Sequence, residues 1–219
     1  MESIGSKSSV TQIFEHDSGG RFKIRKIEGD GNCLFRSMSY LIFGKQREHE
    51  YLRDLVVRYV TEHWEQFSDY NVDEDMDSYK ISMCSFGTYG GELEIVAFSK
   101  IFQTQPVVYF KSSPEQNPLM FGTHGALCFF LYSGPSDNGH YDVLKPLETI
   151  WCDAKTYEQS VKKMRSRCRD SFLEDLKFYK NDLKSLSRVG FKKTSDIMTK
   201  QYDRLTKMAA LDAFDLTKL

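Results

Sequence analysis

A single cysteine lies where a reactive thiol could be activated. Cys33 is carried by the segment Gly-Asp-Gly-Asn-Cys-Leu-Phe, in which a turn rich in glycine precedes a predicted helix. A thiol attacks a carbonyl carbon as the thiolate, and its pKa of about 8.5 must fall for work at neutral pH. The N–H groups and dipole at a helix N-terminus favour that anion and could also receive a developing oxyanion. This segment predicts Cys33 as a nucleophile, although a small buried residue at a helix start would look the same.

A histidine and a carboxylate follow much later in the chain, in Gly139-His140-Tyr141-Asp142. We expect a strand to begin here, and side chains 140 and 142 of a strand point to the same face. Asp142 could therefore orient the imidazole of His140 and stabilise its protonated form, as a nucleophile's base requires. A pair of surface polar residues is the alternative. His124, in a glycine-rich turn, is the rival base.

Hydrophobic spacing predicts the elements that would position these groups. After Cys33, apolar residues recur at helical spacing as far as Gly44, which is a helix stop signal. Other segments of the chain have apolar residues at strand or helical spacing. Helices thus precede most strands without regular alternation, which indicates an α+β protein. The predicted strands are 21–27, 106–110, 126–132 and 141–144, and the predicted helices are 34–43, 47–67, 79–83 and 90–102.

Composition is typical of a soluble globular protein. The 219 residues are 40% hydrophobic and 28% charged, with a formal net charge of −1. The five cysteines are widely spaced and contain no Cys-x-x-Cys, so neither a disulfide framework nor a zinc site is expected. We expect a reducing, cytoplasmic compartment. The apolar run 126–132 is too short for a membrane span.

Charge divides the chain into two parts. Residues 153–219 hold 16 Lys and Arg against 10 Asp and Glu, a net +6, which leaves a net −7 for 1–152. We predict a flexible leader over 1–20, a catalytic domain over 21–152 and a basic helical extension over 153–219. Apolar stripes in the extension favour helices packed on each other or on the domain. A helical module that binds a partner is the alternative. The basic charge of the extension could also contact nucleic acid or an anionic membrane, but we expect no nucleic acid.

Three ordered segments resemble a known family. Asp-Gly-Asn-Cys-Leu-Phe-Arg at 30–36, Tyr-Gly-Gly-Glu-Leu-Glu at 89–94 and Gly-His-Tyr-Asp at 139–142 resemble the ovarian-tumour (OTU) family of cysteine proteases. The resemblance covers about residues 22–150. It implies a papain-like OTU fold of the α+β class, with a small central β-sheet packed between helices. The helical C-terminal extension would be added to that fold.

The same resemblance implies roles for individual residues. Cys33 would be the nucleophile, His140 the general base and then acid, and Asp142 the orienting residue, with Asp30 as another carboxylate nearby. The loop of Asp30, Gly31 and Asn32 would form the oxyanion hole with the N–H of Cys33. Residues near the substrate channel would be Tyr89, Gly90, Gly91 and Tyr141.

The implied reaction needs no metal or cofactor. It is hydrolysis of isopeptide bonds at the C-terminal glycine of ubiquitin or polyubiquitin, through a Cys-His-Asp triad and a thioester, by a monomer. One alternative is a catalytically inactive module that binds ubiquitin, and another is a protease for a different ubiquitin-like protein. The location would be the cytoplasm, or the host cytoplasm for a secreted effector.

Overall fold

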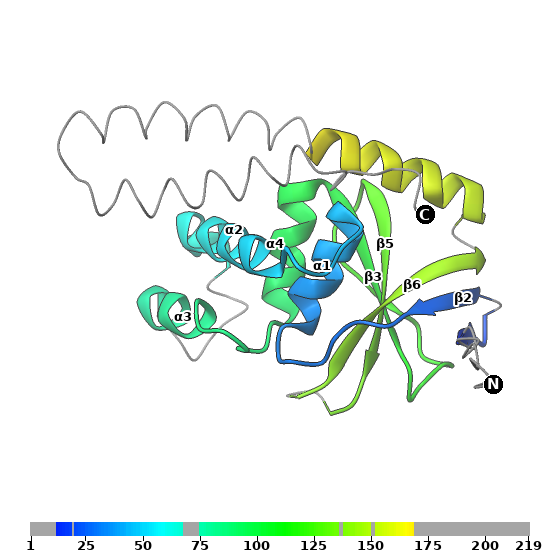
Figure 1. Ribbon diagram of the computed structural model, residues 1–219, viewed down its shortest axis with the longest axis horizontal. Coiled ribbons are helices and arrows are strands. Elements are labelled where there is room, and N and C mark those ends of the chain that lie inside the picture. Colours follow the sequence, from blue (N-terminus) through cyan, green and yellow to red (C-terminus); the bar gives the residue numbers. More distant parts are fainter. Residues whose placement is uncertain (1–11, 19, 68–74, 136–137, 150–151, 169–219) are drawn as a thin grey trace, which may run out of the picture.

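A mixed β-sheet runs through the centre of the protein (Figure 1). The structure is a computed structural model that describes residues 12–18, 20–67, 75–135, 138–149 and 152–168. The strands of this part lie in the order β1-β2-β6-β5-β3-β4, in which β3 and β5 are parallel and every other pair is antiparallel. They are β1 (Ile13–His16), β2 (Gly20–Arg25), β3 (Thr104–Phe110), β4 (Leu119–Met120), β5 (Ala126–Ser133) and β6 (His140–Glu148).

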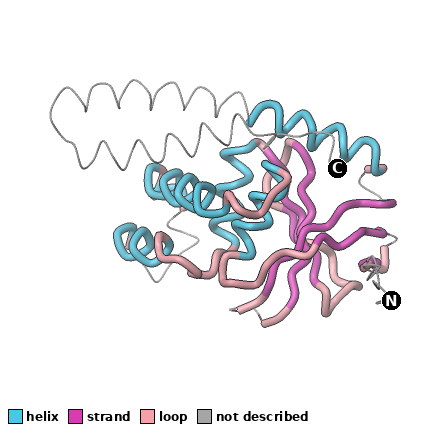
Figure 2. Tube along the Cα trace, in the orientation of Figure 1, coloured by secondary structure: helices cyan, strands magenta, loops and turns pink. Residues whose placement is uncertain are grey.

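Helices cover the sheet and each other. The helices labelled α1 to α4 in Figure 1 lie to one side of the strands, as the cyan helices and magenta strands of Figure 2 also show. Helix α1 packs against β6, α4 packs against β3, and α2 packs against both helices. They are α1 (Cys33–Phe43), α2 (His49–Glu62), α3 (Met76–Met83) and α4 (Glu92–Phe102), with a 3-10 turn at Trp64–Gln66 and a further helix over 154–168. None of these helices has the length and hydropathy that crossing a bilayer would require.

Alternation along β5 divides the core between two faces of the sheet. Phe130 packs its ring edge-on against Phe98 of α4, at a centroid distance of 6.5 Å. Its neighbour Phe129 points to the opposite face, where its ring lies 5.4 Å from Phe22 and 5.6 Å from Tyr157. Side chains on both faces of β5 are therefore buried, which explains its continuous apolar run. The predicted α+β arrangement, with a central sheet between helices, is confirmed.

The predicted helix after Cys33 ends where expected. Gly44 adopts a left-handed conformation with φ of 72°, and its N–H donates to the carbonyl of Tyr40. A glycine takes this conformation without a steric penalty, and it closes the last turn of a helix. Helix α1 therefore has a defined length between the turn before Cys33 and Gly44.

The predicted flexible leader over 1–20 is wrong at its C-terminal end. Residues Ile13–His16 form β1, which pairs antiparallel with β2. Phe14 is buried against the rings of Phe22 and Tyr109, at 6.2 Å and 5.8 Å between centroids. Apolar burial therefore orders this short strand, and the polar residues around it hide the pattern. Residues 1–11 lie outside the described residues.

The beginning of the predicted extension packs on the domain that precedes it. Helix 154–168 buries Tyr157, Val161 and Met164, which share one helical face. Arg165 is also buried, and its guanidinium donates to the carbonyls of Leu41 (2.7 Å) and Tyr40 (2.9 Å). These carbonyls end α1, where a cation is favourable. The boundary at 152/153 stays a prediction, and the helices predicted after residue 170 lie outside the described residues.

We expect Arg165→Met to lower the free energy of unfolding by about 1–3 kcal/mol, because the buried carbonyl of Leu41 loses its donor. Arg167→Met is the matched control on the same helix. Arg167 donates to Gln103 at the exposed surface, so its removal should change stability by less than about 0.5 kcal/mol. Urea unfolding of both variants measures the difference, and equal effects would contradict a special role for Arg165.

Candidate active site

Helix α1 holds Cys33 against strand β6. Cys33 is the first residue of α1 and is buried, with a relative exposure of 3%. One turn later, the hydroxyl of Ser37 donates to the carbonyl of Tyr141 at 3.1 Å. The backbone N–H of Tyr141 in turn interacts with the Cys33 thiol. Cys33, the candidate nucleophile, therefore lies beside the residue that follows His140, and Ser37, which the sequence did not single out, helps to hold it there.

Burial dominates the electrostatics of this thiol. Desolvation raises the pKa of Cys33 above its ordinary value, and the backbone N–H groups of Tyr141, Leu34 and Cys33 itself offset the rise only in part. This differs from the expectation that the helix N-terminus would lower the pKa. The described contacts also include no hydrogen bond between Cys33 and His140. Burial therefore disfavours the thiolate form of Cys33 in this structure.

His140 and Asp142 lie on one face of β6, as the sequence predicts. His140 is the first residue of the strand, with 29% of its side chain exposed, and Nε2 lies 3.2 Å from Oδ1 of Asp142. Asp142 is only 2% exposed. With Nε2–H donating to this carboxylate, the other ring nitrogen, Nδ1, is free to accept a proton. The geometry is that of a base and its orienting group.

Two more groups fix the carboxylate of Asp142. Oδ1 accepts the backbone N–H of Ile27 at 2.9 Å, and Oδ2 accepts Nζ of Lys26 at 2.8 Å. Lys26 and Ile27, which lie between β2 and the Cys33 loop, thereby bind the strand that carries His140. Neither Lys26 nor Ile27 could be found from the sequence, because both contacts are with a residue far along the chain.

Nδ1 of His140 faces the loop that leads to the nucleophile. A methyl group placed on Gly29 would lie 3.5 Å from Nδ1, in ordinary van der Waals contact, so the backbone of this loop lies close to the ring. The imidazole therefore lies between Asp142 on one side and the segment that ends in Cys33 on the other.

Asp30 makes a different set of contacts. Its carboxylate accepts Nε of Arg36 at 3.0 Å and a terminal nitrogen of Arg36 at 2.6 Å, and it also accepts the N–H of Asn32 at 3.1 Å. The Arg36 guanidinium holds the pKa of this carboxyl well below its usual range. These contacts bind Asp30 to its own loop, and the observed contact with His140 comes from Asp142 instead.

Asn32 and Gly31 anchor the predicted oxyanion loop in the interior. Asn32 is buried, and its Oδ1 accepts from Arg53 at 2.8 Å and from the N–H of Gly87 at 3.2 Å. Gly31 has φ of +81°, and a methyl group there would lie 2.4 Å from the Gly87 carbonyl oxygen. Only glycine fits this position. Arg53 was not identified from the sequence as a contact of this loop. Its signal in the sequence is an arginine next to the apolar face of α2, where burial is expected.

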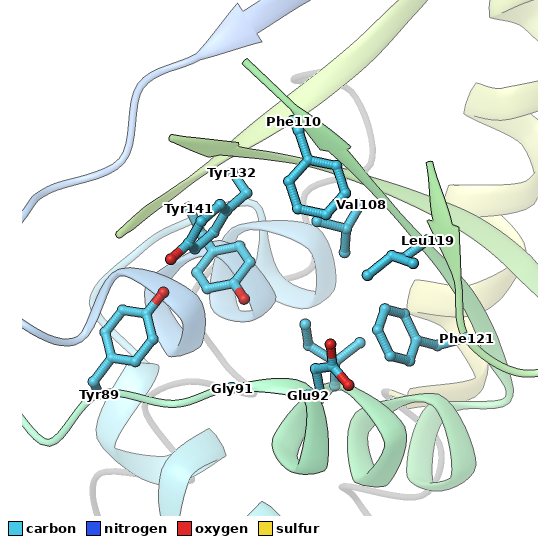
Figure 3. Close-up of a pocket in the computed structure, with 10 residues that line it drawn as sticks. Tyr89, Gly91, Glu92, Val108, Phe110, Leu119, Phe121, Tyr132 and Tyr141 are labelled. Carbon is cyan, nitrogen blue, oxygen red and sulfur yellow. The ribbon is translucent and has the colours of Figure 1, made fainter. Parts of the chain in front are cut away.

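The predicted channel residues line a cavity (Figure 3). Tyr89, Gly91 and Tyr141 contribute to a cavity of about 210 Å³, together with aromatic and aliphatic side chains of β3, β4, β5 and α4. The rings of Tyr89 and Tyr141 stack at 6.2 Å. Gly90 lies under the cavity instead, where a methyl group would come within 3.0 Å of Leu34 and Phe35. Three of the four predicted channel residues are thus brought together.

The remaining candidates are less well placed for chemistry. His124 is exposed, and its hydrogen bond is with the neighbouring Thr123 at 3.4 Å. Within the described ranges, no group of three or more His, Cys, Asp and Glu side chains is arranged to hold a metal ion.

Comparison with known proteins identifies relatives of the central part of the chain. The family model described as OTU-like cysteine protease matches residues 28–141. The chain is 29% identical over 94 residues to OVARIAN TUMOR DOMAIN-containing deubiquitinating enzyme 7 of Arabidopsis thaliana, covering 42% of this chain and 25% of that protein. It is 33% identical over 94 residues to OTU domain-containing protein 3 of Mus musculus, covering 42% and 24%. The chain thus spans about a quarter of these curated relatives.

Solved structures share the fold. The Hazara virus OTU bound to ubiquitin matches with a TM-score of 0.51 and 19% identity, over 66% of this chain and 95% of that chain. A structure of an OTU domain in complex with ubiquitin also matches with a TM-score of 0.51, at 18% identity, over 67% and 86%. At these identities the likeness concerns the arrangement of helices and strands.

The burial of Cys33 predicts how the reactivity of its thiol depends on pH. We expect the rate of Cys33 alkylation by iodoacetamide to rise with pH through an inflection above the ordinary thiol value of about 8.5, because the thiolate is the reactive form and burial raises the pKa. Peptide-resolved mass spectrometry measures the rate, with the exposed Cys84 as internal reference. An inflection below the ordinary value would show instead a preformed pair of thiolate and imidazolium.

Proposed function

This chain belongs to the family of OTU-like cysteine proteases, and we propose that it is a deubiquitinase acting on isopeptide bonds at the C-terminal glycine of ubiquitin. The observation that carries the proposal is the place of His140. Its Nε2 is held by the buried Asp142, and its Nδ1 faces the loop that ends in Cys33. Nucleophile, base and orienting carboxylate thus come from α1 and β6, which pack directly on each other.

The proposed reaction begins with acyl transfer. Sγ of Cys33 attacks the carbonyl carbon of the terminal glycine while Nδ1 of His140 takes the thiol proton. Asp142 stabilises the imidazolium that forms, since its carboxylate stays fixed by Lys26 and Ile27. The imidazolium then gives its proton to the lysine amine as the bond to it breaks. The products of this half-reaction are a free lysine side chain and a thioester on Cys33.

Hydrolysis of the thioester completes the cycle. His140 takes a proton from water as the oxygen attacks the thioester carbonyl, and the proton returns to the leaving Cys33 thiolate. The N–H groups of Cys33 and of the Asp30–Asn32 loop would bind the oxyanion of each tetrahedral intermediate. Each such donor contributes about 10²–10³-fold to the rate in known acyl-transfer enzymes.

The channel supports a substrate that ends in glycine. Tyr89 and Tyr141 stack on each other in the lining of the cavity, and the backbone N–H of Tyr141 meets the Cys33 thiol, so a substrate chain bound along these rings would reach the thiol with a small residue such as glycine. The cavity beyond them is lined mainly by aromatic and aliphatic groups and would bind an apolar side chain upstream of the glycine. Ubiquitin as the substrate is further supported by the two similar structures described as complexes with ubiquitin.

A ubiquitin-binding module without activity is the second candidate. The buried thiol, with its raised pKa and without a hydrogen bond to His140, is the observation that favours it. A ubiquitin probe with a C-terminal electrophile separates the two functions. An active enzyme forms a covalent adduct at Cys33, and a binding module leaves the probe unreacted.

We expect Cys33→Ala to abolish cleavage of di-ubiquitin and labelling by the probe while binding to ubiquitin is retained. The reason is that the substitution removes the attacking atom and leaves the cavity intact. Cys84→Ala, at an exposed cysteine, should retain full activity and is the control. Cleavage is measured on all di-ubiquitin linkages. Cleavage by Cys33→Ala at the wild-type rate would exclude Cys33 as the nucleophile.

Asp142→Asn should lower kcat/KM by at least about 100-fold, because an amide carries no negative charge to stabilise the imidazolium that forms on His140. Lys26→Gln removes another partner of the same carboxylate. Since 54% of the Lys26 side chain is exposed, we expect a loss of about 3-fold or less. Steady-state hydrolysis of a fluorogenic ubiquitin substrate measures both, and a small effect of Asp142→Asn would assign orientation to another group.

A further inference from the structure

We propose that Arg53 is a positioning residue that sets the geometry of the oxyanion loop. This inference rests on the proposed function, since the loop matters only if an oxyanion forms there. Arg53 belongs to α2, one layer behind α1, and has a relative exposure of 4%. It would act through Asn32, not on the substrate.

The guanidinium of Arg53 joins three segments at one point. One terminal nitrogen donates to Oδ1 of Asn32 and to the carbonyl of Thr88, both at 2.8 Å. The other donates to the carbonyl of Met83 at 3.1 Å, at the end of α3. The group lies over the ring of Phe35 at 4.0 Å from its centroid. It is thus fixed by α1, by the end of α3 and by the loop that follows α3.

Asn32 transmits this position to the backbone of the loop. Its Oδ1 accepts from Arg53 and Gly87, and its Nδ2 donates to the carbonyl of Asp30 at 3.3 Å. Asn32 is also the residue that precedes α1, and its carbonyl accepts the N–H of Arg36 at 2.8 Å. A displacement of the side chain therefore moves both ends of the loop and the first N–H groups of α1.

The chemistry of arginine suits this task. A guanidinium presents several donors in a rigid plane, so it can serve acceptors on three segments at fixed angles, whereas a lysine offers one compact ammonium group. Burial lowers the pKa of Arg53, which reflects the unfavourable desolvation of its charge. An apolar residue would fill the same space without this penalty. The charged group offsets this unfavourable desolvation by holding the loop in a defined geometry.

The experiment compares Arg53→Lys with Arg58→Lys, at an exposed arginine of the same helix. For hydrolysis of a fluorogenic ubiquitin substrate, we expect Arg53→Lys to lower kcat at least about 10-fold and to change KM less than about 2-fold, because an oxyanion donor acts mainly on the transition state. Arg58→Lys should match the wild type. A parallel rise in KM, or an unchanged kcat, overturns the proposal.

Alkylation of Cys33 distinguishes an effect on the oxyanion loop from an effect on the position of the thiol. Iodoacetamide reacts with Cys33 by displacement at a saturated carbon and forms no oxyanion, so Arg53→Lys should change this rate less than about 2-fold. The guanidinium of Arg53 contacts α1 at the ring of Phe35, and its described hydrogen bonds are to Asn32, Thr88 and Met83 and not to the Cys33 thiol. A loss of alkylation equal to the loss of kcat would mean that the nucleophile has moved, which contradicts the proposal.

A double-mutant cycle tests the route through Asn32. Asn32→Ala alone should reproduce the loss of kcat without placing a lysine in the interior, which keeps the test valid if Arg53→Lys folds poorly. In the Asn32→Ala background, Arg53→Lys should cost less than about 3-fold further, because residues acting through one contact are not additive. Additive losses would show that Arg53 acts by another route.

Amide hydrogen exchange distinguishes this inference from the proposed function. Arg53→Lys should speed exchange in peptides covering 29–34 and 84–91 relative to Arg58→Lys, whether or not the wild type cleaves ubiquitin. An inactive wild type with faster exchange in the variant would refute the deubiquitinase alone. An active wild type with unchanged exchange and unchanged kcat in the variant would refute the role of Arg53 alone.

Discussion

The seating of helix α1 on strand β6 is the contact on which the candidate site depends. Ser37 binds the carbonyl of Tyr141, the thiol of Cys33 meets the N–H of the same residue, and His140 is the next residue along the strand. One helix–strand contact thus sets the distance between nucleophile and base. Because α1 is buried almost throughout its length, this contact is supported by the core and not by surface groups.

Local patterns in the sequence predicted most of this framework. The stop at Gly44 and the apolar face of α1 are encoded within a few residues, as is the shared face of His140 and Asp142. The apolar run of β5 likewise reflects burial on both of its faces. Helix 154–168 lies within the predicted helical extension, and its start has a local signal, since the side chain of Asp153 accepts the N–H of Thr156 at 2.9 Å.

What the sequence could not predict is what depends on long-range contacts. Strand β1 is too short to show a period, and it exists because Phe14 finds partners on β2 and β3. The groups that hold Asp142 and Asn32 come from other segments, and no spacing rule connects them. The raised pKa of Cys33 could not be predicted from the sequence either, because desolvation depends on everything packed around the thiol and not on the turn that precedes it.

The strand order has a consequence for how the protein is made. Strand β2 pairs with β6, the last of the described strands, so the pairing of the β1–β2 hairpin with the rest of the sheet requires that β6 has left the ribosome. A nascent chain that ends at Ser133 contains Cys33 and the whole of α1, yet has neither His140 nor Asp142. Domains are synthesised from the N-terminus at about 5–20 residues per second, so the thiol precedes its base by several seconds. Until β6 arrives, the unfinished chain carries a cysteine without the machinery to use it.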